Sequence, residues 1–128
     1  MTDVQKDLLK KDLCARLDTN FVCSIYRVDD EGVGYRDEIL HGYCKGDIWY
    51  EFYFREDCSI GIDDVSKIKP YLFPMSSMTE EQKEDMIKSS CGIGSDKNVF
   101  DWYNKNHFDY RGLIPIGLAN DATGLNIY

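Results

Sequence analysis

The spacing of apolar residues changes near residue 21, and this change constrains the fold more than any other feature of the chain. From Val4 to Leu17, apolar residues recur mainly every four positions, which is typical of an amphipathic helix. From residue 21 the pattern shifts toward alternation, as in strands with one buried face. The stretch IWYEFYF at 48–54 is almost wholly β-branched or aromatic and is the strongest strand signal. The sequence therefore predicts an α+β fold in which a helix precedes a sheet.

Residues 1–18 contain the predicted N-terminal helix. Thr2 and Gln5 fit a T-x-x-Q capping box, in which each side chain satisfies a backbone N–H group that the first turn leaves unpaired. The apolar stripe of this helix is expected to face the core. Its charged residues are expected on the exposed face, and they are Lys6, Asp7, Lys10, Lys11 and Asp12.

Residues 21–68 are predicted to form an antiparallel sheet. Turn-forming residues separate five short strand candidates, which lie at 21–26, 35–43, 48–54, 58–62 and 65–68. Short strands joined by brief loops are typical of an antiparallel meander. Five of them after a helix predict a small curled sheet of the SH3-like or Sm-like barrel type.

Residues 79–119 are predicted to be the helical C-terminal part. Thr79 and Gln82 form a second capping box, which opens a helix that ends near Ser90. A further helix is expected at about 96–106, followed by an apolar hook. The fold class is thus a curled sheet with an N-terminal helix and two C-terminal helices.

The segment between the sheet and these helices, 69–78, is expected to be a linker without regular structure, because it contains Pro70 and Pro74. The last eight residues, 121–128, carry no strong signal and are expected to form a tail. A length of 128 residues fits a single domain spanning 1–128.

The net charge limits the classes of partner. Asp and Glu number 23 against 15 Lys and Arg, which gives a formal net charge of −8. Such a chain repels phosphate backbones, so a general affinity for nucleic acid is disfavoured. The hydrophobic fraction of 43% is too high for a disordered chain.

The cysteines and the N-terminus predict a cytoplasmic protein. The five cysteines include no CxxC pair, which argues against a disulfide framework and a structural zinc site. Cys14, Cys23 and Cys58 are expected to be buried as small hydrophobic residues. The N-terminus has no signal-peptide core, and no apolar run approaches the roughly 20 residues that span a membrane. No cofactor, metal or membrane contact is expected.

No constellation in the sequence predicts catalysis. Cys91 and His107 would need direct contact and a third, orienting group to act as a nucleophile pair. His41 and Cys44 supply only two ligands, too few for a zinc site. His107 is instead expected to cap the end of the last helix, where a positive charge is favourable. The chain is therefore predicted not to be an enzyme.

The aromatic stretch 48–54 is one candidate for partner binding. Trp49 and Tyr53 are expected on one face of this strand, opposite Tyr50 and Phe52. One face must be core. The other face is open to three interpretations: simple packing under the flanking helices, contact with a protein, or stacking of single-stranded nucleic acid.

Tyr110 and Arg111 are the other candidates. Arg111 is expected either to pair with Asp109 or Asp101 and lock the tail onto the last helix, or to act with Tyr110 as an anchor for a partner. Both residue types often dominate the binding energy of interfaces.

Three stretches together resemble a known family. They are LKKDLCARL (9–17), KPYLFPMSSMTEEQKEDM (69–86) and DWYNKNHFDYRGLIPIGLA (101–119). The chain resembles small proteins of unassigned function from Bacteroidetes phages, prophages and mobile elements, although Phe73 stands where that family tends to carry a basic residue. The resemblance implies a source and a shared fold, and it implies no catalytic residue.

The sequence therefore predicts a non-enzymatic accessory protein of a phage or mobile element that acts through protein–protein contact. The alternative is a small barrel that binds single-stranded nucleic acid with the aromatic strand 48–54.

Overall fold

The structure is a computed structural model that describes residues 1–17, 19–29, 32–40, 42–45, 50–55, 58–90 and 95–128. Its helices are α1 (Asp3–Ala15), α2 (Glu80–Ser89) and α3 (Ser95–Lys105), with 3-10 helices η1 (Ile62–Lys67) and η2 (Met75–Ser77). Its strands are β1 (Val22–Asp29), β2 (Gly32–Ile39), β3 (Gly42–Lys45), β4 (Tyr50–Arg55), β5 (Cys58–Gly61), β6 (Ile68–Leu72) and β7 (Asn120–Asp121). The predicted α+β class is confirmed.

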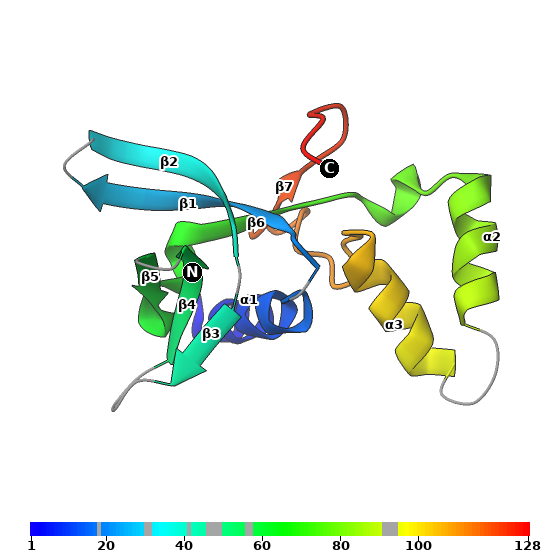
Figure 1. Cartoon of the computed structure of the whole chain (residues 1–128), viewed down its shortest axis with the longest axis horizontal. Coiled ribbons are helices and arrows are strands. Elements are labelled where there is room, and N and C mark those ends of the chain that lie inside the picture. Colours follow the sequence, from blue (N-terminus) through cyan, green and yellow to red (C-terminus); the bar gives the residue numbers. More distant parts are fainter. Residues whose placement is uncertain (18, 30–31, 41, 46–49, 56–57, 91–94) are drawn as a thin grey trace.

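The strands form two sheets (Figure 1). The larger sheet has the order β2-β1-β6-β7, in which β1 pairs antiparallel with β2 and β6, whereas β6 and β7 are parallel. The smaller sheet is antiparallel and has the order β3-β4-β5. Among the described residues no ladder joins the two sheets. The sheet is open, so the expected SH3-like or Sm-like barrel is not confirmed.

The boundaries of two predicted strands differ from the structure. The single strand expected at 35–43 is divided between β2 and β3, which belong to different sheets. The strand expected at 65–68 is mostly the 3-10 helix η1, and β6 lies in the segment expected to be a linker. Pro70 is compatible with β6 because pairing with β1 ends at this residue and pairing with β7 begins at Tyr71.

The helices begin where the sequence predicts. Thr2 and Gln5 form the capping box of α1, with N···O distances of 3.0 and 3.1 Å. Thr79 and Gln82 form the same motif at α2, with distances of 2.8 and 3.1 Å. Both capping boxes are confirmed. They could be predicted because each depends only on residues three positions apart.

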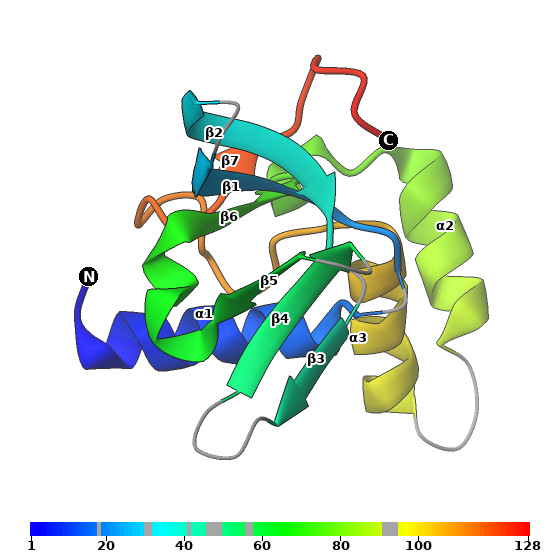
Figure 2. The same cartoon turned by 60° about the vertical axis from the view of Figure 1, so that its left-hand side comes forward.

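The core lies between α1, the larger sheet and the C-terminal hook (Figure 2). Its fully buried members include Leu9 and Leu13 of α1, together with Phe21, Ile25, Ile68, Leu72 and Leu113. Leu118 and Ala119 are also buried, which confirms the apolar hook. Cys23 is buried as expected, whereas Cys14 is exposed, since it lies on α1 away from the core. The side chain of Cys58 lies outside the described residues.

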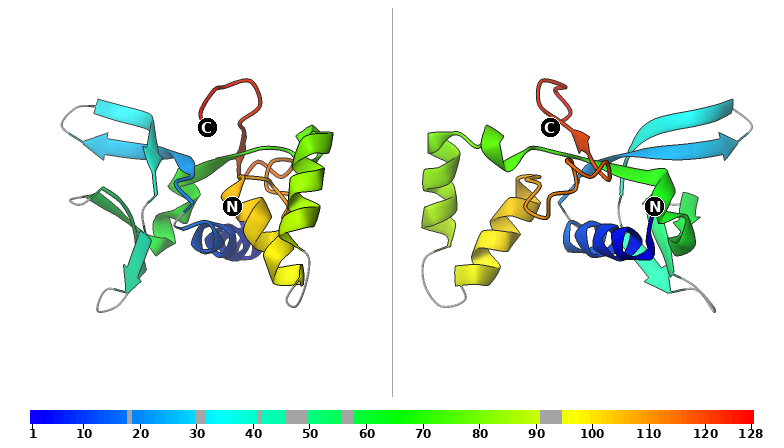
Figure 3. Two further views of the ribbon diagram at one scale, coloured as in Figure 1. Left: turned by 45° about the vertical axis from the view of Figure 1, so that its right-hand side comes forward. Right: turned by 180° about the vertical axis from the view of Figure 1, so that it is seen from behind.

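The C-terminal residues are attached to the larger sheet, which the sequence did not indicate. β7 extends the sheet beside β6, and the Tyr128 hydroxyl accepts a hydrogen bond from the Val22 N–H (2.8 Å) and donates one to the Tyr71 carbonyl (2.7 Å). The views from the side and from behind show this segment arching over the sheet (Figure 3).

The helices α2 and α3 form a pair at one end of the molecule, and the smaller sheet lies at the other end, with α1 between them (Figures 1 and 3). No helix in the described ranges has the length and apolar character needed to cross a membrane.

Candidate functional site

A buried ion pair lies at the C-terminal end of α1. Arg16 Nε donates to Asp12 Oδ2 at 2.8 Å, and Arg16 Nη2 donates to Asp12 Oδ1 at 3.1 Å. Both side chains are fully buried. The expectation that Asp12 faces solvent is therefore wrong, because Arg16, one turn later, supplies the paired charge that permits burial.

The same arginine connects α1 to the segment after α3. Arg16 Nη2 also donates to the Phe108 carbonyl at 2.6 Å, across 92 residues of sequence. A fully buried arginine that reaches a distant backbone carbonyl fixes the position of the chain there. The segment from Phe108 to Arg111 is thereby held against the end of α1.

Arg111 pairs with Asp12, and the expected partners Asp109 and Asp101 are wrong. The distance from Arg111 Nε to Asp12 Oδ1 is 3.3 Å. The Asp109 carboxylate instead accepts the Leu113 and Ile114 N–H groups, at 2.8 and 2.9 Å. Asp101 pairs with Lys97 on its own helix. Arg111 therefore ties the segment after α3 to α1 and not to α3.

We call Asp12, Arg16 and Arg111 the arginine cluster. Two guanidinium groups share one carboxylate, so the cluster carries a net charge of +1 within a chain of net charge −8. Arg16 Nη1 is buried and has no hydrogen-bond partner in the described part of the chain. The cluster itself thus holds one more positive than negative charge.

Aromatic side chains surround Tyr110. Its ring lies 5.3 Å from the Phe100 ring and stacks on Tyr103 at 5.6 Å, measured between centroids. The Arg111 guanidinium carbon lies 4.8 Å from the same ring centroid, and that of Arg16 lies 5.4 Å away. Arg111 Nη2 also donates to the Tyr110 hydroxyl at 3.0 Å. Tyr110 therefore joins the aromatic residues of α3 to the arginine cluster.

A cavity of about 440 Å³ opens beside these residues, lined by Ala15, Phe100, Asn104, Tyr110 and Arg111. We call it the corner pocket. Its volume lies within the range of ligand sites. Phe100 is 49% exposed although it is a large apolar side chain, and Arg111 is 27% exposed. The pocket thus combines apolar walls with one accessible cation.

Asn104 adds an unpaired acceptor to the corner pocket. Its side chain is only 6% exposed, and its Oδ1 atom has no hydrogen-bond partner among the described residues. A buried polar atom without a partner costs free energy, so such atoms are rare in folded proteins. Asn104 thus brings an acceptor without a partner to a residue that lines the corner pocket.

His107 lies next to this site in a left-handed backbone conformation, with φ of 64°. The Phe108 N–H bonds to the Tyr103 carbonyl and the His107 N–H to the Asn104 carbonyl, which forms a Schellman motif at the end of α3. Burial, and secondarily the Arg16 charge, lower the pKa of His107 to about 4. The prediction that a positive charge on His107 stabilises the helix end is therefore wrong, because the ring is neutral at pH 7. The ring stacks on that of Tyr128, with 3.7 Å between the centroids. Cys91, its suggested partner, lies outside the described residues.

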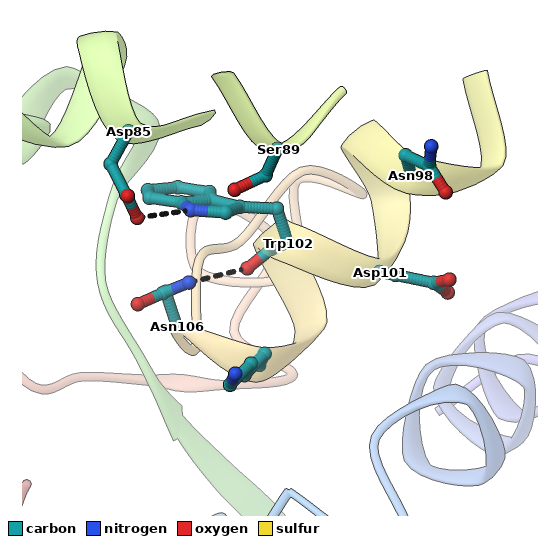
Figure 4. A pocket seen from close by; sticks show the side chains of 7 residues that line it. Asp85, Ser89, Asn98, Asp101, Trp102 and Asn106 are labelled. Atoms are coloured by element: carbon teal, nitrogen blue, oxygen red, sulfur yellow. Dashed lines mark hydrogen bonds between the residues drawn. The ribbon is translucent and has the colours of Figure 1, made fainter. Parts of the chain in front are cut away.

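A second cavity, of about 400 Å³, lies between α2 and α3 (Figure 4). Trp102 Nε1 donates to Asp85 Oδ2 at 2.8 Å, and Asn106 Nδ2 donates to the Trp102 carbonyl at 2.9 Å. Trp102 is only 6% exposed and stacks on Phe108. The indole N–H of Trp102 and a carboxylate oxygen of Asp85 are bonded to each other across the cavity, so it forms a joint between the two helices, and we take the corner pocket as the candidate site.

The aromatic strand is present as β4, in which Tyr53 pairs with Gly42 and Ser59. Trp49 and the side chain of Tyr53 lie outside the described residues, and so does His41. The exposed face of 48–54 therefore stays a prediction. Within the described ranges, no group of three or more His, Cys, Asp or Glu side chains is placed to hold a metal ion.

The sequence pointed to Tyr110 and Arg111, which the structure brings together in the corner pocket. It missed Asp12, Arg16 and Asn104. The one available signal was the i, i+4 spacing of Asp12 and Arg16, which is common on exposed helix surfaces and does not by itself indicate a site. In comparisons with known proteins, no family model matches the chain, and no significant match is found to a curated protein or to a solved structure.

Proposed function

We propose that this chain is a non-enzymatic accessory protein of a phage or mobile element that acts by contact with another protein, and that the corner pocket is the contact site. The observation that carries the proposal is the half-exposed Phe100 beside the partly exposed Arg111, at the mouth of a cavity. Aromatic and arginine side chains at a concave surface commonly supply most of the binding energy of an interface.

The chemistry of the pocket supports a binding role. Its polar side chains are the guanidinium of Arg111, the amide of Asn104 and the phenol of Tyr110. Guanidinium and amide groups are poor general acids and bases near neutral pH, whereas both recognise hydrogen-bonding partners with defined geometry. The phage source rests on the resemblance of 9–17, 69–86 and 101–119 described above.

Selection from peptide libraries tests the proposal. Random peptides are displayed with either a free N-terminus or a free C-terminus and are selected on the immobilised full chain. We expect a consensus peptide that binds the wild type and a Val33→Asp variant but not a Phe100→Asp variant. Val33 is a matched control because it is also exposed, at 67%, and lies on β2.

Two results would contradict the proposal. One is the absence of any enriched peptide from either library, and the other is equal binding to the Phe100→Asp and Val33→Asp variants. Salt-sensitive binding of short single strands that is lost in Trp49→Ala or Tyr53→Ala would favour the nucleic-acid alternative instead.

A further inference from the structure

The corner pocket offers three chemically distinct contacts within one cavity of about 440 Å³. Arg111 supplies a cation, Asn104 Oδ1 supplies an unpaired acceptor, and Phe100 with Tyr110 supplies apolar walls. A ligand that matches all three must carry an anion, an N–H donor and an apolar group close together.

The charge of the arginine cluster calls for an anion. Two guanidinium groups face the single carboxylate of Asp12. In the described part of the chain the Asp109 carboxylate is not paired with either guanidinium and instead accepts the backbone N–H groups of Leu113 and Ile114. Arg111 Nε is buried beside Asp12 and Nη2 donates to the Tyr110 hydroxyl, while the side chain as a whole is 27% exposed and lines the pocket. A carboxylate is the anion that proteins most often present to such a fork.

Asn104 helps to decide whether the carboxylate belongs to a chain terminus or to an Asp or Glu side chain. A partner must bring a donor to the buried Oδ1 atom, and a peptide N–H group is the commonest donor in proteins. In the last residue of a polypeptide, the N–H group, the free carboxylate and the side chain all branch from one Cα atom. An internal Asp or Glu holds its carboxylate further from its own N–H group and has no apolar side chain on the same residue.

We infer that the corner pocket receives the C-terminal residue of the partner protein, with its α-carboxylate on Arg111, its N–H group on Asn104 Oδ1 and an apolar side chain against Phe100 and Tyr110. The inference rests on the proposed function and specifies the ligand class of the same site. It makes this chain a reader of apolar protein C-termini.

Three small probes separate this ligand from its rivals: N-acetyl-L-leucine, N-acetyl-L-leucinamide and N-acetyl-L-glutamic acid α-methylamide. The first carries all three features, the second lacks the carboxylate, and the third places the carboxylate on a side chain. Binding to the full chain is measured by shifts of backbone and side-chain amide signals in ¹H–¹⁵N NMR spectra. We expect N-acetyl-L-leucine to bind with a Kd on the order of millimolar, because it has few atoms, and the other two probes to bind at least about tenfold more weakly.

Variants locate the binding. Arg111→Gln should weaken N-acetyl-L-leucine binding by about tenfold or more, whereas Lys88→Gln, which removes the same charge from the exposed surface of α2, should leave it unchanged. Asn104→Leu introduces a better helix former with the same number of side-chain heavy atoms and removes the unpaired acceptor, so it should fold at least as well as the wild type. It should nevertheless bind the probe several-fold more weakly. This second variant keeps the test valid if Arg111→Gln does not fold.

The inference is overturned if the leucinamide or the glutamate probe binds as tightly as N-acetyl-L-leucine, if no probe shifts the Asn104 side-chain signals, or if Asn104→Leu binds normally. If the libraries yield a peptide that needs Phe100 for binding, but any of these three results is also obtained, only the inference about the C-terminal residue is overturned and the proposed function stands. Failure of both experiments removes the proposed function as well.

Discussion

Arg111 reaches the Asp12 carboxylate at 3.3 Å, although the two residues lie 99 positions apart in the chain (111 − 12 = 99). Asp12 also pairs with Arg16, so one buried carboxylate serves two arginines. The contact joins α1 to the segment after α3 and sets the wall of the corner pocket. The stability of the fold and the shape of the pocket therefore depend on the same acid.

Replacement of Asp12 by Asn should be strongly destabilising. It leaves the fully buried Arg16 guanidinium without its counter-charge, and it removes the carboxylate that Arg16 shares with Arg111. Breaking a buried ion pair on one side typically costs about 3–5 kcal/mol. Urea unfolding measures this loss in the free energy of unfolding. The matched control is Asp7→Asn, an exposed acid on the same helix, which should change it by less than about 0.5 kcal/mol. A loss below about 1 kcal/mol for Asp12→Asn would contradict the central place given to the ion pair.

His107 should make stability depend on pH in the acid range. Its pKa falls from the ordinary 6.5 to about 4 in the folded protein, so the unfolded chain binds more protons between these values. Above pH 6.5 the ring is neutral in both the folded and the unfolded chain, and the free energy of unfolding has its full value. As the pH falls from 6.5 toward 4, the unfolded chain takes up the proton first, and the free energy of unfolding decreases. With allowance for partial solvation of the ring, we expect the free energy of unfolding to fall by about 2 kcal/mol more in the wild type than in His107→Asn between pH 7 and pH 4. Asn suits the left-handed backbone here.

Urea unfolding of the wild type and of His107→Asn across this pH range measures the difference between their free energies of unfolding. Both proteins contain the same carboxylates, so the carboxylate contributions cancel in this difference. Parallel curves for the two proteins would show that His107 is not held neutral by the fold. An NMR titration of the His107 ring provides an independent reading of the same pKa.

Tyr128→Phe should loosen the C-terminal segment. The variant keeps the ring that stacks on His107 and removes the hydroxyl that bonds to Val22 and Tyr71. We expect the free energy of unfolding to decrease by about 1–2 kcal/mol and hydrogen exchange at the Val22 amide to become faster. Tyr35→Phe, at a more exposed tyrosine of β2, serves as the control. Equal effects of the two substitutions would mean that the Tyr128 hydroxyl contributes nothing specific.

Trp102→Phe should release α2 without unfolding the domain. No residue of α2 is buried, and the Trp102 indole N–H donates to Asp85 of this helix. Removing this donor should increase hydrogen exchange in 80–89, while exchange in α1 stays unchanged. Uniform loss of protection in both helices would show that Trp102 supports the whole core.

Features that depend on neighbours in sequence were predictable, and contacts across the fold were not. The two capping boxes and the strands β1, β4 and β5 follow from spacings of two to four residues, whereas the single strand expected at 35–43 is divided between β2 and β3. The burial of Asp12 was not predictable, because an i, i+4 pair such as Asp12 and Arg16 is common on exposed helix surfaces, and the segment that covers this pair comes from the far end of the chain. β7 has only two residues and pairs in parallel with β6, so no periodic pattern marks it. The candidate site was half predictable: Tyr110 and Arg111 stand out by residue type, whereas Asn104 matters only because the fold leaves its Oδ1 atom unpaired.

Photo-crosslinking from the corner pocket tests the central claim most directly. A benzophenone amino acid replaces Phe100, or Val33 as the control, in the full chain, which is then irradiated in a lysate of a Bacteroidetes bacterium, chosen because the proposed source is a Bacteroidetes phage or mobile element. We predict one discrete protein adduct from position 100, which excess wild-type chain competes away and excess Phe100→Asp chain does not. The same adducts from positions 100 and 33, or no adduct from position 100, would contradict the proposal that this pocket binds a protein.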